Sequence, residues 1–533
     1  MKMAKKRDGL PGLRLGRPKT EPKKRGRRKP WHARTPHERG WGLRGTGETT
    51  VVQPALESRG TTVQVCGLWP FSAGATMPTI GTPLGSHQRI EATVYGDPMS
   101  WFVGGVIATP SGFILGRPAV GKSSLSRRIC TWMDYCGVIP MILADLKPDY
   151  RAFITACGGE TIPVGEVTTD VDGVTTVGHI NPLDLLGAHG RIAHLPPRVR
   201  GWALEKLLSQ QNNVLRGLLE IANQGEPLTG EEASLIPTVL NLLQVGPERT
   251  PLDRDAPTIR EVLAVFEQDQ PHPRLMMKVL AASPVEYHAS TRRLRQLLMA
   301  LLEDGPFGAV FDGPTRHLDL SKPGGFDVSQ IDDEDQAKQA AVQLACWSYG
   351  VASIALQTKL SDVYPKEYPR RRYLLIMDEL WRLLRVSGQL VYRVDKLTRI
   401  NREMGVGQLM ITHTMDDLRL STEELTRIAW GFVERASMVF LGGLAGREFG
   451  NLQEVFALSR QERESMTDWA AEGGIDPATG KGTGPRGRGK FLMKLGKQPG
   501  VPFEVVLTKE ELVVHDTNRR WAELTAQGEE SVA

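Results

Sequence analysis

The chain has 533 residues, which at about 150 residues per domain predicts three to four domains. Its hydrophobic content of 40% and charged content of 24% are sufficient for a sizeable core. Its 56 glycines and 35 prolines stay well below the share of a low-complexity polymer. A wholly disordered protein and a collagen-like protein are therefore excluded. The net charge of +5 is unevenly distributed, because residues 1–30 carry thirteen Lys or Arg against two acidic residues and the rest of the chain is mildly acidic.

The cysteines and the apolar stretches indicate the compartment. Five cysteines without a Cys-x-x-Cys pair argue against a disulfide scaffold and against a thiolate zinc site. No run reaches the roughly 18 apolar residues of a membrane span, and the charged N-terminus lacks the apolar core of a secretory signal. We expect a cytoplasmic protein, and binding to a membrane surface stays open.

The basic N-terminal segment is predicted to be a disordered tail over residues 1–48. Its Lys/Arg runs are broken by Gly and Pro, so it cannot bury enough apolar surface to order itself. Two interpretations remain open. The tail is either solvated and without a specific partner, or it is a polybasic arm that binds DNA or anionic lipid.

The order of segments after the tail predicts an α/β protein. Short strand-like pieces alternate with Gly/Pro turns in residues 49–100. Residues 101–192 place a helix between two apolar strands, as in the first part of a parallel α/β domain. Helical spacing of apolar residues predicts a helical insertion over 193–335, and later apolar runs predict the second part of the α/β domain over 336–472. A Gly-rich linker, a β-hairpin and a C-terminal tail are expected over 473–533.

The strongest motif is a full match to GxxxxGK[ST], placed between an apolar strand and a helix. The backbone N–H groups of such a loop and the positive end of the following helix bind the phosphates of a nucleotide. Lys122 is expected to reach the β- and γ-phosphates, and the Ser123 hydroxyl to join the Mg²⁺ shell. The predicted phosphate-binding residues are Gly116, Arg117, Pro118, Ala119, Val120, Gly121, Lys122, Ser123 and Ser124.

A second apolar run, residues 373–377, ends in Asp378 and Glu379. In a P-loop fold the first acid holds Mg²⁺, and the second polarises the attacking water as a general base. A strand that simply ends in solvated acids has the same pattern. Its place downstream of a complete phosphate loop favours the catalytic interpretation.

A third apolar run, residues 409–411, ends in Thr412 and His413. The strand beside the metal-binding strand often carries a polar side chain near the γ-phosphate, so His413 or Thr412 is a candidate sensor. A structural histidine whose hydrogen bonds are satisfied within the fold is an equal alternative for His413.

Taken in order, the segments resemble the TraC-like conjugation ATPases of type IV secretion systems, which belong to the HerA–FtsK superfamily of P-loop motors. Besides the phosphate loop, the resemblance rests on ADLKPDYRAFITACGG, INPLDL, PTIREVL, GPFGAVFDGPT, GGFDVSQI, MDELWRLL and THTMDDL, and it covers roughly residues 78–510. INPLDL and the FDG and FDVS segments are the more specific motifs.

The resemblance implies a RecA-like P-loop NTPase with a mostly parallel sheet and a helical subdomain inserted after the second strand. It also implies a homo-oligomer, often a hexamer, that uses ATP and Mg²⁺ and works with type IV secretion channel proteins, peripheral on the cytoplasmic face of the plasma membrane. By position, Lys122 matches the phosphate loop, Asp378 the metal-binding acid and Glu379 the water-activating acid. His413 stands where the superfamily usually has Gln.

An arginine finger is needed if ATP sits between subunits. Arg399 and Arg402, between the acid strand and the sensor strand, are the first candidates, and Arg435 follows them. Solvated arginines on an exposed helix are an equally good interpretation of each.

Three functions are compatible with these residues. The first is an ATP-hydrolysing motor for conjugative DNA transfer or type IV-like secretion. The second, within the same fold, is a DNA translocase or coupling protein of the FtsK or TraG kind. The third is a scaffold that binds nucleotide for assembly without turnover, which the intact lysine and acids disfavour.

Overall fold

The computed structural model describes the chain from residue 78 to residue 514 with several gaps. The described residues are 78–169, 175–245, 255–302, 305–332, 334–386, 388, 391–392, 395, 405–473 and 485–514. The predicted tail, most of the following strand-rich segment and the chain beyond residue 514 lie outside them. Within the described part, no helix combines the length and the apolar character needed to cross a membrane.

An eleven-stranded sheet organises the described residues, in the order β2-β1-β13-β12-β11-β3-β10-β9-β4-β8-β5. Its parallel part runs from β11 to β5, and the strands from β12 to β2 pair antiparallel at one side. The parallel strands are β3 (Ser111–Leu115), β4 (Val138–Asp145), β5 (Glu160–Pro163), β8 (Gly324–Asp327), β9 (Arg372–Met377), β10 (Val406–Thr412) and β11 (Met438–Leu441). The antiparallel strands are β1 (Pro83–His87), β2 (Thr93–Tyr95), β12 (Lys490–Lys494) and β13 (Val501–Val505).

The central strands are buried on both faces, which is why they are continuous apolar runs. Every residue of β4 and of β10 is buried. Alternate side chains point to opposite sides, so that Ile114 packs in one core cluster and Phe113 and Leu115 in the other. The predicted mostly parallel α/β fold is confirmed.

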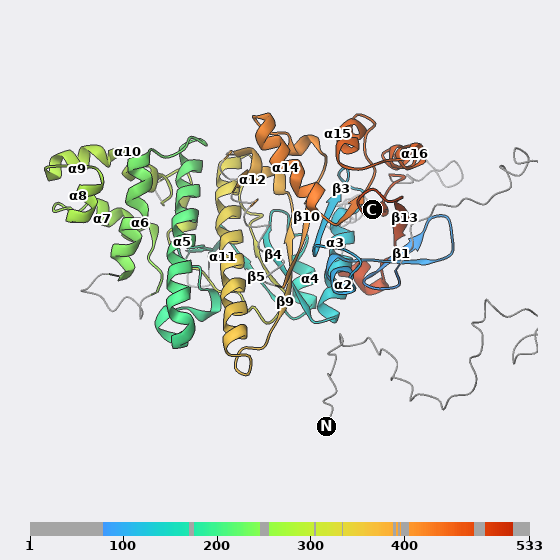
Figure 1. The fold of residues 1–533 in the computed structure, drawn as a ribbon, viewed down its shortest axis with the longest axis horizontal. Helices are drawn as coiled ribbons and strands as arrows, with labels where there is room; N and C mark the ends of the chain where they lie inside the picture. The colour runs from blue at the N-terminus through green and yellow to red at the C-terminus, as the bar shows by residue number, and fades with distance from the viewer. Residues whose placement is uncertain are drawn as a thin grey trace, which may run out of the picture. The chain divides into compact units, whose positions relative to one another are not determined.

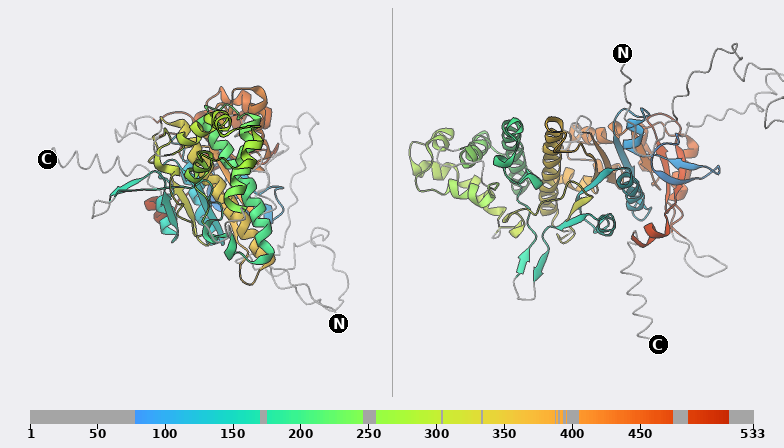
Figure 2. Two further views of the ribbon diagram at one scale, coloured as in Figure 1. Left: turned by 90° about the vertical axis from the view of Figure 1, so that its left-hand side faces the viewer. Right: turned by 90° about the horizontal axis from the view of Figure 1, so that it is seen from below.

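Helices cover the two faces of the sheet (Figures 1 and 2). The core cluster with Ile114 includes α3 (Lys122–Tyr135) and α4 (Arg151–Ala156). The other cluster includes α11 (Gln336–Val363), α12 (Leu380–Val386) and α14 (Glu423–Arg435). The remaining described helices around the eleven-stranded sheet are α2 (Pro98–Val103), α15 (Glu448–Val455), α16 (Arg460–Trp469) and α17 (Lys509–Val514).

A helical subdomain packs against α11 on the side away from the sheet (Figure 1). The long helix α5 (Pro197–Ala222) lies along α11, and α6 (Gly230–Val245) lies along α5. Because α11 is covered by the sheet on one side and by α5 on the other, it is buried over most of its length. The shorter helices are α7 (Ile259–Phe266), α8 (Pro273–Lys278), α9 (Pro284–Ser290) and α10 (Arg292–Ala300).

The boundaries of this insertion differ from those expected. The helices occupy 197–300, and β8, inside the range expected to be helical, is a strand of the main sheet between β4 and β5. The insertion also follows β5 and a separate hairpin, β6 (Val167–Thr169) with β7 (Thr175–Val177), rather than the second strand directly. The sequence GGFD of β8 has one bulky apolar residue, so it lacks the apolar run by which a buried strand is recognised.

Candidate nucleotide-binding site

Four neighbouring parallel strands bring the predicted site residues to one edge of the sheet. The order β3-β10-β9-β4 places the phosphate loop, His413, Asp378 and Asp145 at the carboxyl ends of adjacent strands. In open α/β sheets, ligands bind outside these carboxyl ends. Residues that are up to about 300 positions apart in the sequence therefore surround one site.

The phosphate loop turns between the end of β3 and the first residue of α3, Lys122. Ala119 and Gly121 both have left-handed backbone conformations, with φ of 66° and 97°. Only glycine adopts such a conformation without steric cost, which accounts for Gly121 immediately before the helix. The turn places the N-terminus of α3, a 14-residue helix, at the site.

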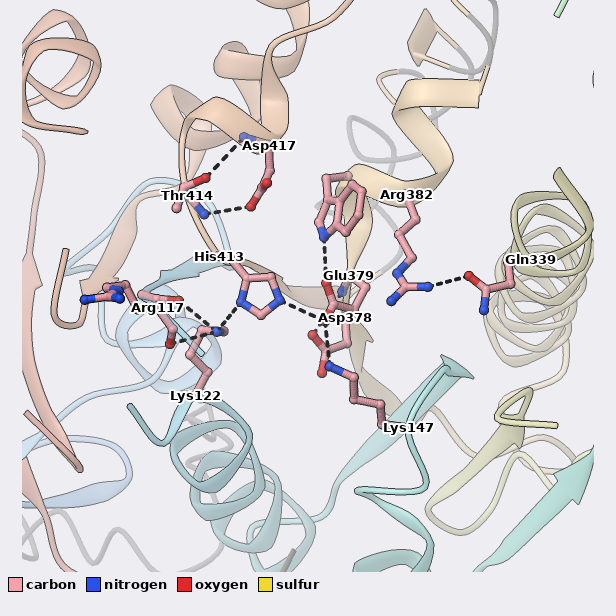
Figure 3. A network of polar contacts seen from close by, with 12 residues as sticks. Arg117, Lys122, Lys147, Gln339, Asp378, Glu379, Arg382, His413, Thr414 and Asp417 are labelled. Atoms are coloured by element: carbon pink, nitrogen blue, oxygen red, sulfur yellow. Dashed lines mark hydrogen bonds and ion pairs between the residues drawn. The ribbon is translucent and has the colours of Figure 1, made fainter. Parts of the chain in front are cut away.

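The Lys122 ammonium group lies inside the loop (Figure 3). It donates to the carbonyl oxygens of Gly116 at 2.7 Å and Arg117 at 3.3 Å, and its Nζ lies 2.7 Å from Nδ1 of His413. Burial lowers the pKa of Lys122 to about 8, although the charges of Asp378 and Glu379 oppose this shift. An anion in the loop would offset the cost of burying this cation.

Glu379 is held from three sides (Figure 3). Its Oε1 lies 3.1 Å from Nε2 of His413 and 3.4 Å from Nζ of Lys147, and its Oε2 accepts from the Trp381 indole at 2.6 Å. Its backbone is left-handed, with φ of 50°. Burial would raise the pKa of this carboxyl group, but the hydrogen bond from His413 and the positive charge of Lys147 lower it to about 2. Glu379 is therefore ionised at neutral pH.

Asp378, one residue earlier, has the opposite electrostatic character. Burial and the neighbouring charge of Glu379 raise the pKa of Asp378 to about 6, while Lys122 opposes the shift. Burial and the charges of Asp149, Asp378 and Asp327 likewise raise the pKa of Asp145. Two adjacent acids with pKa values moved in opposite directions can take different roles.

The chemistry of this edge fits a bound Mg²⁺ ion. Asp378 and Ser123 line the same cavity, and their side chains offer oxygen atoms, the ligands that Mg²⁺ prefers. Burial and the neighbouring charge of Glu379 raise the pKa of Asp378, and a bound cation would favour its ionised form. Ser123 and Asp378 are the residues that would hold the metal.

These groups surround a cavity of about 440 Å³. Its volume lies within the range of small-molecule sites. The described residues that line it are Pro118, Ala119, Gly121, Lys122, Ser123, Ser124, Arg127, Asp145, Leu146, Lys147, Asp149, Asp378, Glu379, His413, Pro485 and Arg488.

Most of the predicted site residues thus line one cavity. The exceptions are three residues of the phosphate loop, Thr412 and the candidate arginine fingers. Gly116, Arg117 and Val120 belong to the loop but do not line the cavity, and the first two contribute carbonyl oxygens to Lys122. Thr412, the alternative sensor, is fully buried, whereas His413 faces the cavity.

The candidate arginine fingers are not brought to this cavity. Arg399 and Arg402 lie outside the described residues. Arg435 ends α14 near the amino end of β3, the edge opposite the phosphate loop, where Thr109 donates to its carbonyl oxygen at 3.2 Å. Its guanidinium group lies 2.5 Å from the Asp395 carboxylate.

Several lining residues were not predicted from the sequence. Asp145 could have been predicted, because it ends an apolar strand and Asp378 directly follows one. Lys147 and Asp149 come shortly after Asp145. Arg127 lies within α3, one turn after the loop. Pro485 and Arg488 come from the Gly-rich segment before β12 and had no signal. Pairing of the C-terminal strands with the rest of the sheet brings these last two residues to the cavity. The other lining residues that were not predicted are Arg127, Asp145, Leu146, Lys147 and Asp149.

Comparison with known proteins yields similar folds. No protein-family model matches the chain, and no curated protein matches its sequence. VirB4 of Thermoanaerobacter pseudethanolicus is similar in structure, with 18% sequence identity, a TM-score of 0.58, and coverage of 82% of this chain and 100% of that chain. The plasmid coupling protein TrwB, in complex with ADP and Mg²⁺, has 13% identity, a TM-score of 0.40, and coverage of 75% of this chain and 85% of that chain. The likeness to VirB4 confirms the expected RecA-like fold.

Proposed function

We propose that this chain is an ATP-hydrolysing motor that energises conjugative DNA transfer or type IV-like secretion. The observation that carries the proposal is the convergence of Lys122, Glu379 and His413 on one cavity at the carboxyl edge of a VirB4-like sheet. A phosphate loop alone binds a nucleotide, whereas an ionised acid linked to the loop lysine through a polar side chain adds the means to hydrolyse it.

We infer a role for each side chain from this arrangement. The loop amides and Lys122 bind the triphosphate of ATP, and Ser123 and Asp378 hold Mg²⁺. When bound, Mg²⁺ neutralises charge on the phosphate oxygens. Glu379, ionised and fixed by Trp381, orients and polarises the attacking water, and His413 connects this acid with Lys122.

The proposal extends to assembly and location. The family resemblance of the sequence motifs implies a homo-oligomer, often a hexamer, and we infer that ATP binds near a subunit boundary. Its partners would be type IV secretion channel proteins, and its place would be in the cytoplasm, peripheral on the inner face of the plasma membrane.

A second candidate is a DNA translocase or coupling protein. The thirteen basic residues within 1–30 favour it, because clustered Lys and Arg bind polyanions through counterion release. A scaffold without turnover is disfavoured, since Glu379 and Asp378 line the cavity together with Lys122.

Steady-state ATP hydrolysis by the purified full chain tests the proposal, with Lys122→Ala as the blank. Turnover that depends on Lys122 and changes little with single- or double-stranded DNA supports a secretion motor. Strong stimulation by DNA moves the assignment to the translocase. ATP binding without hydrolysis, at every protein concentration, contradicts the motor and supports the scaffold.

A further inference from the structure

The segment before β12 crosses the phosphate loop, and we call residues 485–489 the strap. The amide of Gly489 donates to the carbonyl oxygen of Val120 at 2.9 Å, inside the loop. The carbonyl oxygen of Gly489 accepts from Val505 of β13 at 2.8 Å, and within the strap the amide of Arg488 donates to Pro485 at 3.1 Å. The strap is therefore joined by backbone hydrogen bonds to both the loop and the β12–β13 hairpin.

Arg488 is exposed on the strap, and it is one of the residues that line the candidate nucleotide cavity. The other cations that line the cavity contact protein groups: Lys122 contacts loop carbonyl oxygens, Lys147 the Glu379 carboxylate, and Arg127 the carbonyl oxygen of Asp149. Among the described residues, the Arg488 guanidinium group has neither an acidic partner nor a hydrogen bond. A guanidinium group at a phosphate site is suited to bind phosphate oxygens through two parallel hydrogen bonds.

The order of strands determines which end of the nucleotide Arg488 meets. Starting from β3, which carries the loop, β10, β9 and β4 bring His413, Glu379 and Asp145 on one side. On the other side β11 and β12 lead to the strap. The terminal phosphate belongs beside the water-activating Glu379. The rest of the nucleotide then extends across the loop toward the strap.

We propose that Arg488 is a nucleotide-binding residue supplied in cis, which contacts ATP and ADP on the nucleoside side of the β-phosphate. This inference rests on the proposed function only in taking the cavity to bind a nucleoside triphosphate. It adds a contact from the C-terminal hairpin to a site whose predicted residues come from the loop, β9 and β10. It also links the nucleotide to the antiparallel edge of the sheet, because the strap continues directly into β12.

The test compares Arg488→Ala with Arg486→Ala, by calorimetric titration with ATP and with ADP and by steady-state kinetics. Arg486 lies on the same strap, is also exposed, pairs with Asp468 at 3.3 Å, and does not line the cavity, so it controls for disturbance of the strap. We expect Arg488→Ala to weaken binding of ATP and ADP alike by about tenfold, a factor that corresponds to about 1.4 kcal/mol. KM for ATP should rise by a similar factor while kcat changes by less than about twofold, and Arg488→Lys should restore part of the affinity.

Three results would overturn the inference. They are unchanged nucleotide affinity in Arg488→Ala, a loss confined to ATP, which would place Arg488 at the terminal phosphate, and an equal loss in Arg486→Ala. The proposed motor fails in a different way, through a wild-type chain that binds ATP without turnover, and in that case the calorimetric comparison still decides the role of Arg488. A wild-type chain that binds no nucleotide contradicts both.

Discussion

At the scale of single residues, His413 lies between the loop lysine, Lys122, and Glu379, the proposed water-activating acid. The Lys122 ammonium group is a donor only, so Nδ1 of His413 accepts at 2.7 Å, and Nε2 is left to donate to Glu379 at 3.1 Å. This polarity requires the neutral ring with its proton on Nε2. A glutamine offers the same pair of groups, an amide oxygen that accepts and an amide nitrogen that donates. A histidine at this position can therefore make the same pair of hydrogen bonds as a glutamine.

That equivalence predicts the behaviour of two substitutions at position 413. We expect His413→Gln to retain turnover within about tenfold of the wild type, because both hydrogen bonds can be kept. His413→Leu, of similar bulk, should lose on the order of a hundredfold in kcat, since Glu379 and Lys122 then lose their common partner. Steady-state ATPase assays at a fixed pH measure both. Equal rates in the two variants would show that His413 only fills space.

Glu379 is predicted to act in the chemical step and not in binding. The variant Glu379→Gln keeps the size of the side chain and can still accept from Trp381, but it loses the charge that polarises water. We expect ATP affinity within about threefold of wild type and kcat lower by a factor of at least about 100. Calorimetric binding and single-turnover hydrolysis separate the two quantities, with Lys122→Ala as the binding-deficient reference. Unchanged turnover in Glu379→Gln would remove this residue from the catalytic role.

At the scale of elements, β8 depends on the absence of a side chain. It is hydrogen-bonded between β4 and β5, and a Cβ added to Gly325 would lie 2.3 Å from the carbonyl oxygen of Ile142. A Cβ added to Gly324 would meet nothing closer than the Leu318 side chain at 3.3 Å. The first contact is with backbone, which cannot move without displacing β4, whereas the second is with a side chain that can rotate.

The pair Gly325→Ala and Gly324→Ala tests this packing. We expect Gly325→Ala to lower the free energy of unfolding by about 1–3 kcal/mol and Gly324→Ala by clearly less. Urea denaturation followed by tryptophan fluorescence gives the two midpoints. Equal midpoints would contradict the placement of β8 between two strands.

Whether a feature could be predicted from the sequence depends on how far apart in the sequence the residues that form it lie. The phosphate loop and the strands β3, β4, β9 and β10 are local patterns of consecutive residues, so they were predicted and the fold class with them. The strand β8 was missed because two of its four residues are glycine. Arg488 was missed for a different reason: it reaches the cavity only because the hairpin β12–β13 pairs with β11, a contact between distant parts of the sequence that no local pattern reports.

At the scale of the whole molecule, one sheet connects the candidate nucleotide cavity with two other parts of the fold, the helical subdomain and the antiparallel strands. The parallel strands carry the candidate nucleotide cavity at their carboxyl edge. The helical subdomain contacts the sheet through α11, which lies between β8 and β9 in the sequence. The strap connects the same cavity with the antiparallel strands. Both the first described strands and the C-terminal hairpin therefore belong to the sheet that carries the candidate nucleotide cavity.

The basic segment at the N-terminus is predicted to act separately from this cavity. Residues 1–30 precede the described part of the chain, and the lining residues of the cavity begin at Pro118. Deleting residues 1–30 should leave basal ATP hydrolysis within about twofold of wild type. The same deletion should weaken binding to DNA or to anionic vesicles and should flatten the dependence of DNA affinity on salt, because each phosphate contact that is lost removes about 0.9 from the logarithmic salt slope.

Fluorescence anisotropy with a DNA duplex between about 50 and 200 mM salt measures this slope, and co-sedimentation with phosphatidylserine vesicles measures the lipid alternative. A matched variant replaces the six basic residues of 23–29 with glutamine and keeps the length of the chain. If charge is the cause, this variant should lose part of the slope while the deletion loses more, since the deletion removes thirteen basic residues. If binding to both polyanions survives the deletion unchanged, the contact instead lies on the rest of the chain. The mild net acidity of residues 31–533 makes such binding electrostatically less favourable.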